Sequence, residues 1–133
     1  MRNQGRYAAA RLVPYDPAWP ATCDTLAADL RAALGPEWEL EHVGSTSVPG
    51  LVAKPVIDIA VAEPENPTSD TLPALRALGW TEPTTLGAHR AAYLIDGGIR
   101  VAIAHTFTPD QWPGSHVRLF ADWLRRHPDD RDR

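Results

Sequence analysis

The apolar side chains between Trp19 and Leu34 recur at intervals of three and four residues, the spacing of one face of a helix. Asp16 supplies a capping side chain, Pro17 suits the first helical position, and Gly35 follows the last apolar residue. The pattern therefore predicts a helix between Pro17 and Gly35. Its buried stripe is expected to contain Trp19, Cys23, Leu26, Leu30, Ala33 and Leu34.

Two further stretches have the spacing of strands. Residues 37–43 alternate, with Trp38, Leu40 and His42 on one side and glutamates on the other, which predicts a half-buried strand. Residues 56–62 form a nearly continuous apolar run rich in β-branched side chains, which favours a central strand covered on both faces.

The second half of the chain predicts a short helix followed by a hairpin. Residues 69–79 carry leucines at helical spacing between a capping side chain and a glycine. Residues 91–95 and 99–107 flank Asp96-Gly97-Gly98, a tight-turn signal, and predict two antiparallel strands.

A closing helix is expected at residues 115–128, and a short edge strand at residues 11–14. The buried stripe of the closing helix is predicted to be Val117, Phe120, Ala121 and Leu124. The resulting order of elements predicts one α/β (α+β) domain, a mixed sheet flanked by helices. Residues 1–10 and 129–133 are expected to be mobile ends of that domain.

Composition narrows the class of protein. The chain of 133 residues is 44% hydrophobic and carries a net charge of −4, with no basic stripe, which argues against a nucleic-acid partner. No apolar run approaches the roughly 20 residues that cross a bilayer, and the N-terminus has no secretory signal. We therefore expect a cytoplasmic protein with no membrane partner. Its single cysteine, Cys23, is interpreted as a small core residue.

The turn after the strand predicted at residues 37–43 contains several residues that suit the binding of an anion. Gly44, Ser45, Thr46 and Ser47 follow the strand directly, and Lys54 lies a few residues further on. Glycine lets backbone approach a phosphate, hydroxyls donate to it, and a lysine adds a point charge. The alternative is a tight connection that binds nothing.

Asp58 is the more specific signal, because a carboxylate within Val-Ile-Asp-Ile-Ala-Val is costly to bury unless it is paired or binds a metal. Alternation places Asp58 on the face of Val56 and Ala60, near the Gly44-Ser45 turn. The alternative is a hydrogen-bonded core aspartate.

Four other side chains are weaker candidates. His42 shares its strand face with apolar residues and is a hydrogen-bonded core histidine by default. His105 can serve as a general base, and Arg90 can bind a phosphate or an acceptor carboxylate. Arg100 is a further candidate for the acceptor.

Residues 41–51 (EHVGSTSVPGL) and 54–59 (KPVIDI) closely resemble the central motif of the GrpB family, whose fold belongs to the nucleotidyltransferase superfold. Residues 15–19 and 120–128 are similar to the family's opening and closing segments. The resemblance implies that Gly44 and Ser45 contact nucleotide phosphates and that Asp58 binds Mg²⁺. The same motif match makes His42 a candidate catalytic residue that lines the site.

Two departures accompany the resemblance. Active members of the superfold usually carry a second acidic residue two positions after the first; here that position is Ala60, a gap common in the GrpB family. The family also tends to carry His-x-His where our alignment has Arg100-Val101-Ala102, with His105 three residues on.

The leading hypothesis is therefore a protein that binds Mg²⁺ with ATP or another nucleoside triphosphate. It would transfer a group to a small acceptor, by nucleotidyl transfer or ATP-dependent ligation. The alternatives are a non-catalytic nucleotide-binding accessory module and an interaction protein that keeps only the fold.

Overall fold

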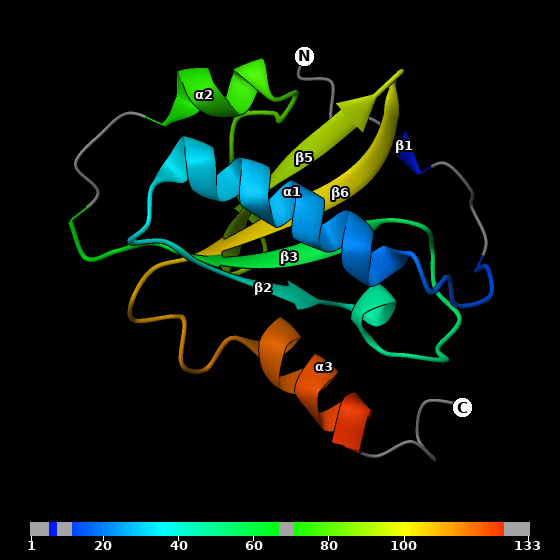
Figure 1. Cartoon of the computed structure of the whole chain (residues 1–133). Coiled ribbons are helices and arrows are strands. Elements are labelled where there is room, and N and C mark those ends of the chain that lie inside the picture. The colour runs from blue at the N-terminus through cyan, green and yellow to red at the C-terminus, as the bar shows by residue number, and fades with distance from the viewer. Residues whose placement is uncertain (1–5, 8–11, 67–70, 127–133) are drawn as a thin grey trace.

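A computed structural model describes residues 6–7, 12–66 and 71–126 of the chain (Figure 1). Its elements, in chain order, are β1 (Arg6–Tyr7), α1 (Trp19–Leu34), β2 (Glu39–Val43), a 3-10 turn η1 (Ser45–Ser47), β3 (Ile57–Ala62), α2 (Leu72–Ala77), β4 (Thr84–Leu86), β5 (His89–Asp96), β6 (Ile99–Phe107) and α3 (His116–Arg126).

The strands form one mixed sheet in the order β2-β3-β6-β5-β4, and β1 pairs with the first residues of β6. β3 and β6 run parallel, whereas the β2–β3, β6–β5 and β5–β4 pairs are antiparallel. The predicted α/β class with a mixed sheet is thus confirmed. No helix in the described residues is long and apolar enough to cross a membrane.

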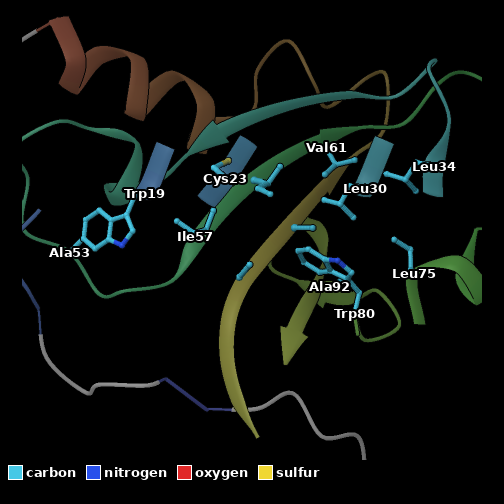
Figure 2. Packing of buried hydrophobic residues seen from close by; sticks show 13 residues of the cluster. Trp19, Cys23, Leu30, Leu34, Ala53, Ile57, Val61, Leu75, Trp80 and Ala92 are labelled. Carbon is cyan, nitrogen blue, oxygen red and sulfur yellow. The ribbon is translucent and has the colours of Figure 1, made fainter. Parts of the chain in front are cut away.

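One face of the sheet is covered by α1, with α2 beside it (Figure 1). Ile57 and Val61 of β3 point toward α1 (Figure 2), and together with Ile59 they pack in the main apolar cluster with Cys23 and Leu30. Cys23 is 3% exposed, and burial, helped by the neighbouring Asp24 carboxylate, raises its thiol pKa to about 11. The burial of Cys23 in this cluster confirms its interpretation as a core residue. A thiol with so high a pKa is protonated at neutral pH.

α1 begins two residues later than expected. The Asp16 carboxylate accepts a hydrogen bond from the Ala18 N–H at 2.8 Å, and the helix starts at Trp19. Gly35 ends it as predicted, with a φ of 110° and its N–H donating to the Arg31 carbonyl.

The hairpin of β5 and β6 turns at Gly97 and Gly98, whose φ values of 58° and 79° are those that a two-residue hairpin turn needs. Two residues after the turn the register changes. Ile95 pairs with Arg100, but Leu94 pairs with Ala102, so that Val101 is an extra residue in β6. This β-bulge decides which side chains of the hairpin reach each face.

Several boundaries differ from the sequence-based predictions. The edge strand expected at residues 11–14 is only a single bridge between Val13 and Ala53. Arg6–Tyr7, expected to be mobile, pairs with β6, and β4 was not predicted. The proposed helix caps Ser69 and Asp70 and the expected mobile end at residues 129–133 lie outside the described residues.

The predicted buried stripe of α3 is wrong in part. Leu124 is 8% exposed, but Phe120 is 52% exposed, like its neighbour Leu119 at 55%. α3 lies beside the β2 edge of the sheet, away from the layer that α1 and α2 form (Figure 1), and Phe120 and Leu119 are left exposed there. The side chains of Val117 and Ala121 lie outside the description.

Candidate functional site

The turn after β2 is closed by its own hydrogen bonds. Gly44 has a φ of 72°, in the left-handed region that favours glycine, and its carbonyl accepts from the Ser47 N–H and from the Ser47 hydroxyl at 2.6 Å. The Ser47 hydroxyl therefore serves the turn. The Ser45 side chain is exposed beside it.

Thr46 is held by His42, a side chain on the α1 face of the sheet. Its hydroxyl lies 2.9 Å from Nε2 of His42, and the residue is 1% exposed. His42 pairs with Ile59 across β2 and β3, and paired residues share a face, so His42 lies on the α1 face. Burial lowers the pKa of His42, and the Arg125 guanidinium lowers it further. His42 thus stabilises the turn from the α1 face through its hydrogen bond with Thr46.

Arg125 of α3 fastens the same turn. Its guanidinium donates to the backbone carbonyls of His42 at 2.9 Å and of Ser47 at 3.2 Å. Hydrogen bonds from a charged donor are the stronger kind, and these two span both ends of the turn.

Asp58 lies directly against the turn from the opposite face. In register, Asp58 pairs with Val43 of β2 and with Ile103 of β6. A Cβ atom added to Gly44 would lie 2.5 Å from Oδ2 of Asp58, so only glycine allows this approach. The carboxylate remains 25% exposed.

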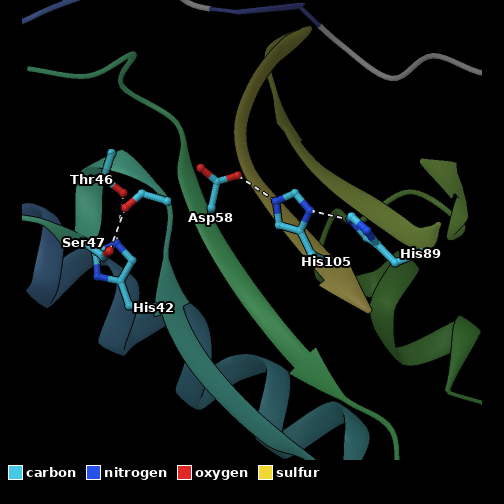
Figure 3. A network of polar contacts seen from close by, with 7 residues as sticks. His42, Thr46, Ser47, Asp58, His89 and His105 are labelled. Carbon is cyan, nitrogen blue, oxygen red and sulfur yellow. Dashed lines mark hydrogen bonds and ion pairs between the residues drawn. The ribbon is translucent and has the colours of Figure 1, made fainter. Parts of the chain in front are cut away.

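The second carboxylate oxygen begins a chain of hydrogen bonds along the sheet (Figure 3). Oδ1 of Asp58 lies 2.8 Å from Nε2 of His105, and Nδ1 of His105 lies 2.9 Å from Nε2 of His89. Because a carboxylate only accepts, His105 donates through Nε2; in its neutral form its Nδ1 then accepts from the Nε2–H of His89. Burial and the neighbouring His105 lower the pKa of His89, which favours the neutral form of His89.

A cavity of about 270 Å³ opens beside Asp58 and the turn. Ser45, Thr46, Lys54 and Asp58 supply its polar wall, and its apolar wall is formed by Leu12, Val56 and Ile103. The exposed Ser45 hydroxyl, the Lys54 ammonium and the Asp58 carboxylate around one cavity suit an anion accompanied by a cation.

The described residues contain no group of three or more His, Cys, Asp or Glu side chains that could hold a metal by themselves. Ala60 faces Glu41 across β2 and β3, but Glu41 pairs with Arg118 of α3 at 3.3 Å. Asp58 is therefore one carboxylate with room beside it. Mg²⁺ fits such a site when phosphates and waters complete its six ligands.

The structure brings together most of the predicted site residues on the Asp58 face, namely Gly44, Ser45, Thr46, Lys54, Asp58 and His105. The structure places Arg90 away from these residues, on the opposite face of the sheet. Arg90 pairs with Thr106 and lines a pocket on the α1 face together with Leu30. Its guanidinium donates to the Pro83 carbonyl at 3.2 Å. Arg100 lies on the Asp58 face, 4.1 Å over the Tyr93 ring.

His89 is the site residue that the sequence-based prediction missed. Counted back from the hairpin turn without a bulge, His105 would pair with Arg90; the extra residue Val101 shifts that partner to Ala91. His89, two residues from Ala91, then shares the face of His105. Only the combination of turn and bulge reveals this, and the bulge has no clear signal in the sequence.

A family model described as GrpB protein matches residues 9–133. Among curated relatives, a UPF0157 protein of Halalkalibacterium halodurans is 38% identical over 131 residues, which cover 94% of this chain and 65% of the relative. Another, of Pseudomonas aeruginosa, is 39% identical over 128 residues, covering 90% of this chain and 51% of the relative. The chain thus spans about half to two thirds of the length of these relatives.

A curated relative of lower sequence identity is a dephospho-CoA kinase. A dephospho-CoA kinase of Mycolicibacterium paratuberculosis is 31% identical over 156 residues, which cover 93% of this chain but 37% of the kinase. The similar region is thus a minor part of that protein.

Among solved structures, the conserved protein GrpB from Enterococcus faecalis superposes with a TM-score of 0.72 at 25% identity, covering 90% of this chain and 74% of the other. The Cid1 poly(U) polymerase bound to MgATP superposes with a TM-score of 0.54 at 16% identity, covering 84% and 39%. The second likeness shows a shared fold alone.

Proposed function

The chain belongs to the GrpB family, and on that premise we propose that it binds a nucleoside triphosphate together with Mg²⁺ in the cavity beside Asp58. One observation carries the proposal. The Asp58 carboxylate is fixed between Gly44 and His105, facing a cavity whose other polar wall consists of Ser45, Thr46 and Lys54. The Cid1 neighbour, described as bound to MgATP, has the same fold and supports this choice of ligand.

The charged and polar residues of the cavity suit different parts of the ligand. Lys54 and the Ser45 hydroxyl face the phosphates, which are anionic and accept hydrogen bonds. Asp58 would hold the metal, because its carboxylate lines the cavity while His105 fixes its orientation. When bound, Mg²⁺ would neutralise charge on the phosphates.

We extend the proposal to transfer of a nucleotidyl or phosphoryl group to a small acceptor. The contribution of the protein to such a reaction is mostly positioning and electrostatic stabilisation. The site is held rigid by three contacts, those of His42 with Thr46, of Arg125 with the turn, and of His105 with Asp58. With Ala60 in place of a second acidic residue, metal binding depends on the nucleotide's own phosphates.

Calorimetric titration of ATP with and without Mg²⁺ tests the binding. We expect the wild type to bind ATP only when Mg²⁺ is present, and Asp58→Asn, which keeps the shape of the side chain, to lose that binding. Asp96→Asn is the matched control, because Asp96 is exposed at the hairpin end of β5. Absence of Mg²⁺-dependent binding in the wild type would overturn the proposal.

A second candidate is a non-catalytic accessory module, favoured by the match to a minor part of a longer kinase. The two candidates differ in turnover. Release of pyrophosphate (nucleotidyl transfer) or of ADP (phosphoryl transfer) with a panel of small acceptors supports transfer, whereas Mg²⁺-dependent binding without any release supports the accessory module. No binding at all leaves an interaction protein that keeps only the fold.

A further inference from the structure

The β-bulge at Val101 sends Arg100 to the face of the sheet that carries Asp58. Beyond the bulge Arg100 pairs with Ile95, whereas Ala102 and Ala104 continue the α1 face. Bulges commonly re-aim a side chain in this way beside functional sites. In an unbroken strand, Arg100 would share the face of Ala102.

The guanidinium of Arg100 lies over the ring of Tyr93. Its Cζ lies 4.1 Å from the centroid of the Tyr93 ring. Tyr93 is 5% exposed and packs in an apolar cluster with Val56, Ala91 and Ile103. Packing fixes the Tyr93 ring, and the ring holds the planar Arg100 guanidinium by a cation–π contact; we call this pair the platform.

This platform adjoins the cavity beside Asp58. Val56 and Ile103 belong both to the cavity wall and to the cluster under Arg100. Tyr93, Ile103 and Asp58 also form one row across β5, β6 and β3. Two strand spacings separate Tyr93 from Asp58, about 10 Å along the sheet.

We propose that Arg100, supported by Tyr93, stacks against the base of the nucleotide whose phosphates lie at Ser45 and Lys54. This inference rests on the proposed function and adds the base site to it. Aromatic faces of bases stack on guanidinium planes, and stacking tolerates every base because each has a π-face. The platform therefore predicts a nucleotide site with little preference among bases.

The test compares Mg²⁺ with ATP, GTP or inorganic triphosphate as the titrant, since inorganic triphosphate has the phosphates without the base. Arg100→Lys keeps the charge and removes the planar surface. We expect it to weaken MgATP and MgGTP about tenfold, within the range measured for base stacking. It should leave magnesium triphosphate unchanged. Arg90→Lys, on the opposite face, is the control and should change none of the three.

Three results would overturn the base site while leaving the proposed function intact. They are equal affinity of the wild type for ATP and inorganic triphosphate, an unchanged MgATP affinity in Arg100→Lys, and an equal loss for both ligands. A wild type that binds neither ligand overturns the proposed function itself. Thermal unfolding of each variant verifies that the fold is retained.

Discussion

The two faces of the sheet differ in what their side chains do, although both are built from the same strands. On β3, Ile57, Ile59 and Val61 pack under α1, while Asp58 between them faces the other way and meets Gly44 and His105. Successive side chains of a strand point to opposite faces, so a residue that packs in the core can be the direct neighbour of a residue in the candidate site. The α1 face is a continuous apolar core, and the Asp58 face combines small apolar clusters with a chain of polar contacts.

The candidate site is nevertheless supported from both faces. His42 holds Thr46 from the α1 side, whereas His105 and His89 hold Asp58 within the open face. Substitutions that separate the two faces therefore give the sharpest tests.

The largest expected effect follows from truncating the core on the α1 face. Ile59 is fully buried, so Ile59→Ala should lower the free energy of unfolding by about 2–5 kcal/mol, measured by urea denaturation. Ile103→Ala, the same truncation on the neighbouring strand but at the cavity wall, should cost less. Equal losses would mean that the two faces contribute alike to stability.

Gly44→Ala should damage the Asp58 face next most strongly. The new Cβ lies 2.5 Å from Asp58 Oδ2, and the positive φ adds strain, so we expect a loss of about 1–3 kcal/mol and of Mg²⁺-dependent ATP binding. Gly50→Ala is the matched control, because Gly50 has a φ of 83° and no atom within 4 Å of the added Cβ. If both variants bind and unfold alike, the contact with Asp58 is unimportant.

His105→Ala should lower the affinity for Mg²⁺ with ATP about tenfold, in the range found for side chains that orient a metal ligand. His89→Asn, one contact further from Asp58, should have a smaller effect in the same titration. An unchanged affinity in His105→Ala would contradict this role of the contact between His105 and Asp58.

The smallest effect concerns pH. Because folding lowers the pKa of His42, the unfolded chain binds its proton more readily, and stability must fall as the pH drops below the ordinary value of about 6.5. One such group contributes a slope of at most about 1.4 kcal/mol per pH unit. His42→Gln should flatten the dependence of the unfolding free energy on pH between 7.5 and 5.5; an unchanged slope would contradict this account.

The features that depend on local pattern could be predicted from the sequence alone. Apolar spacing predicted α1 and its stripe, alternation placed Asp58 opposite Ile57 and Ile59, and the Gly97-Gly98 turn predicted the hairpin. The motif around Gly44 and Asp58 identified the family. These predictions succeed because helix and strand repeats act over a few residues and each buried face needs a matching apolar set.

Which distant side chains meet became known only from the tertiary structure. The extra residue Val101 reverses the face of Arg100 and moves the partner of His105 from Arg90 to Ala91, which brings His89 into the site. The position of α3 at the sheet edge leaves Phe120 exposed and places Arg125 on the turn. Register and the packing of helices arise from contacts between segments far apart in the chain, and no local spacing records them.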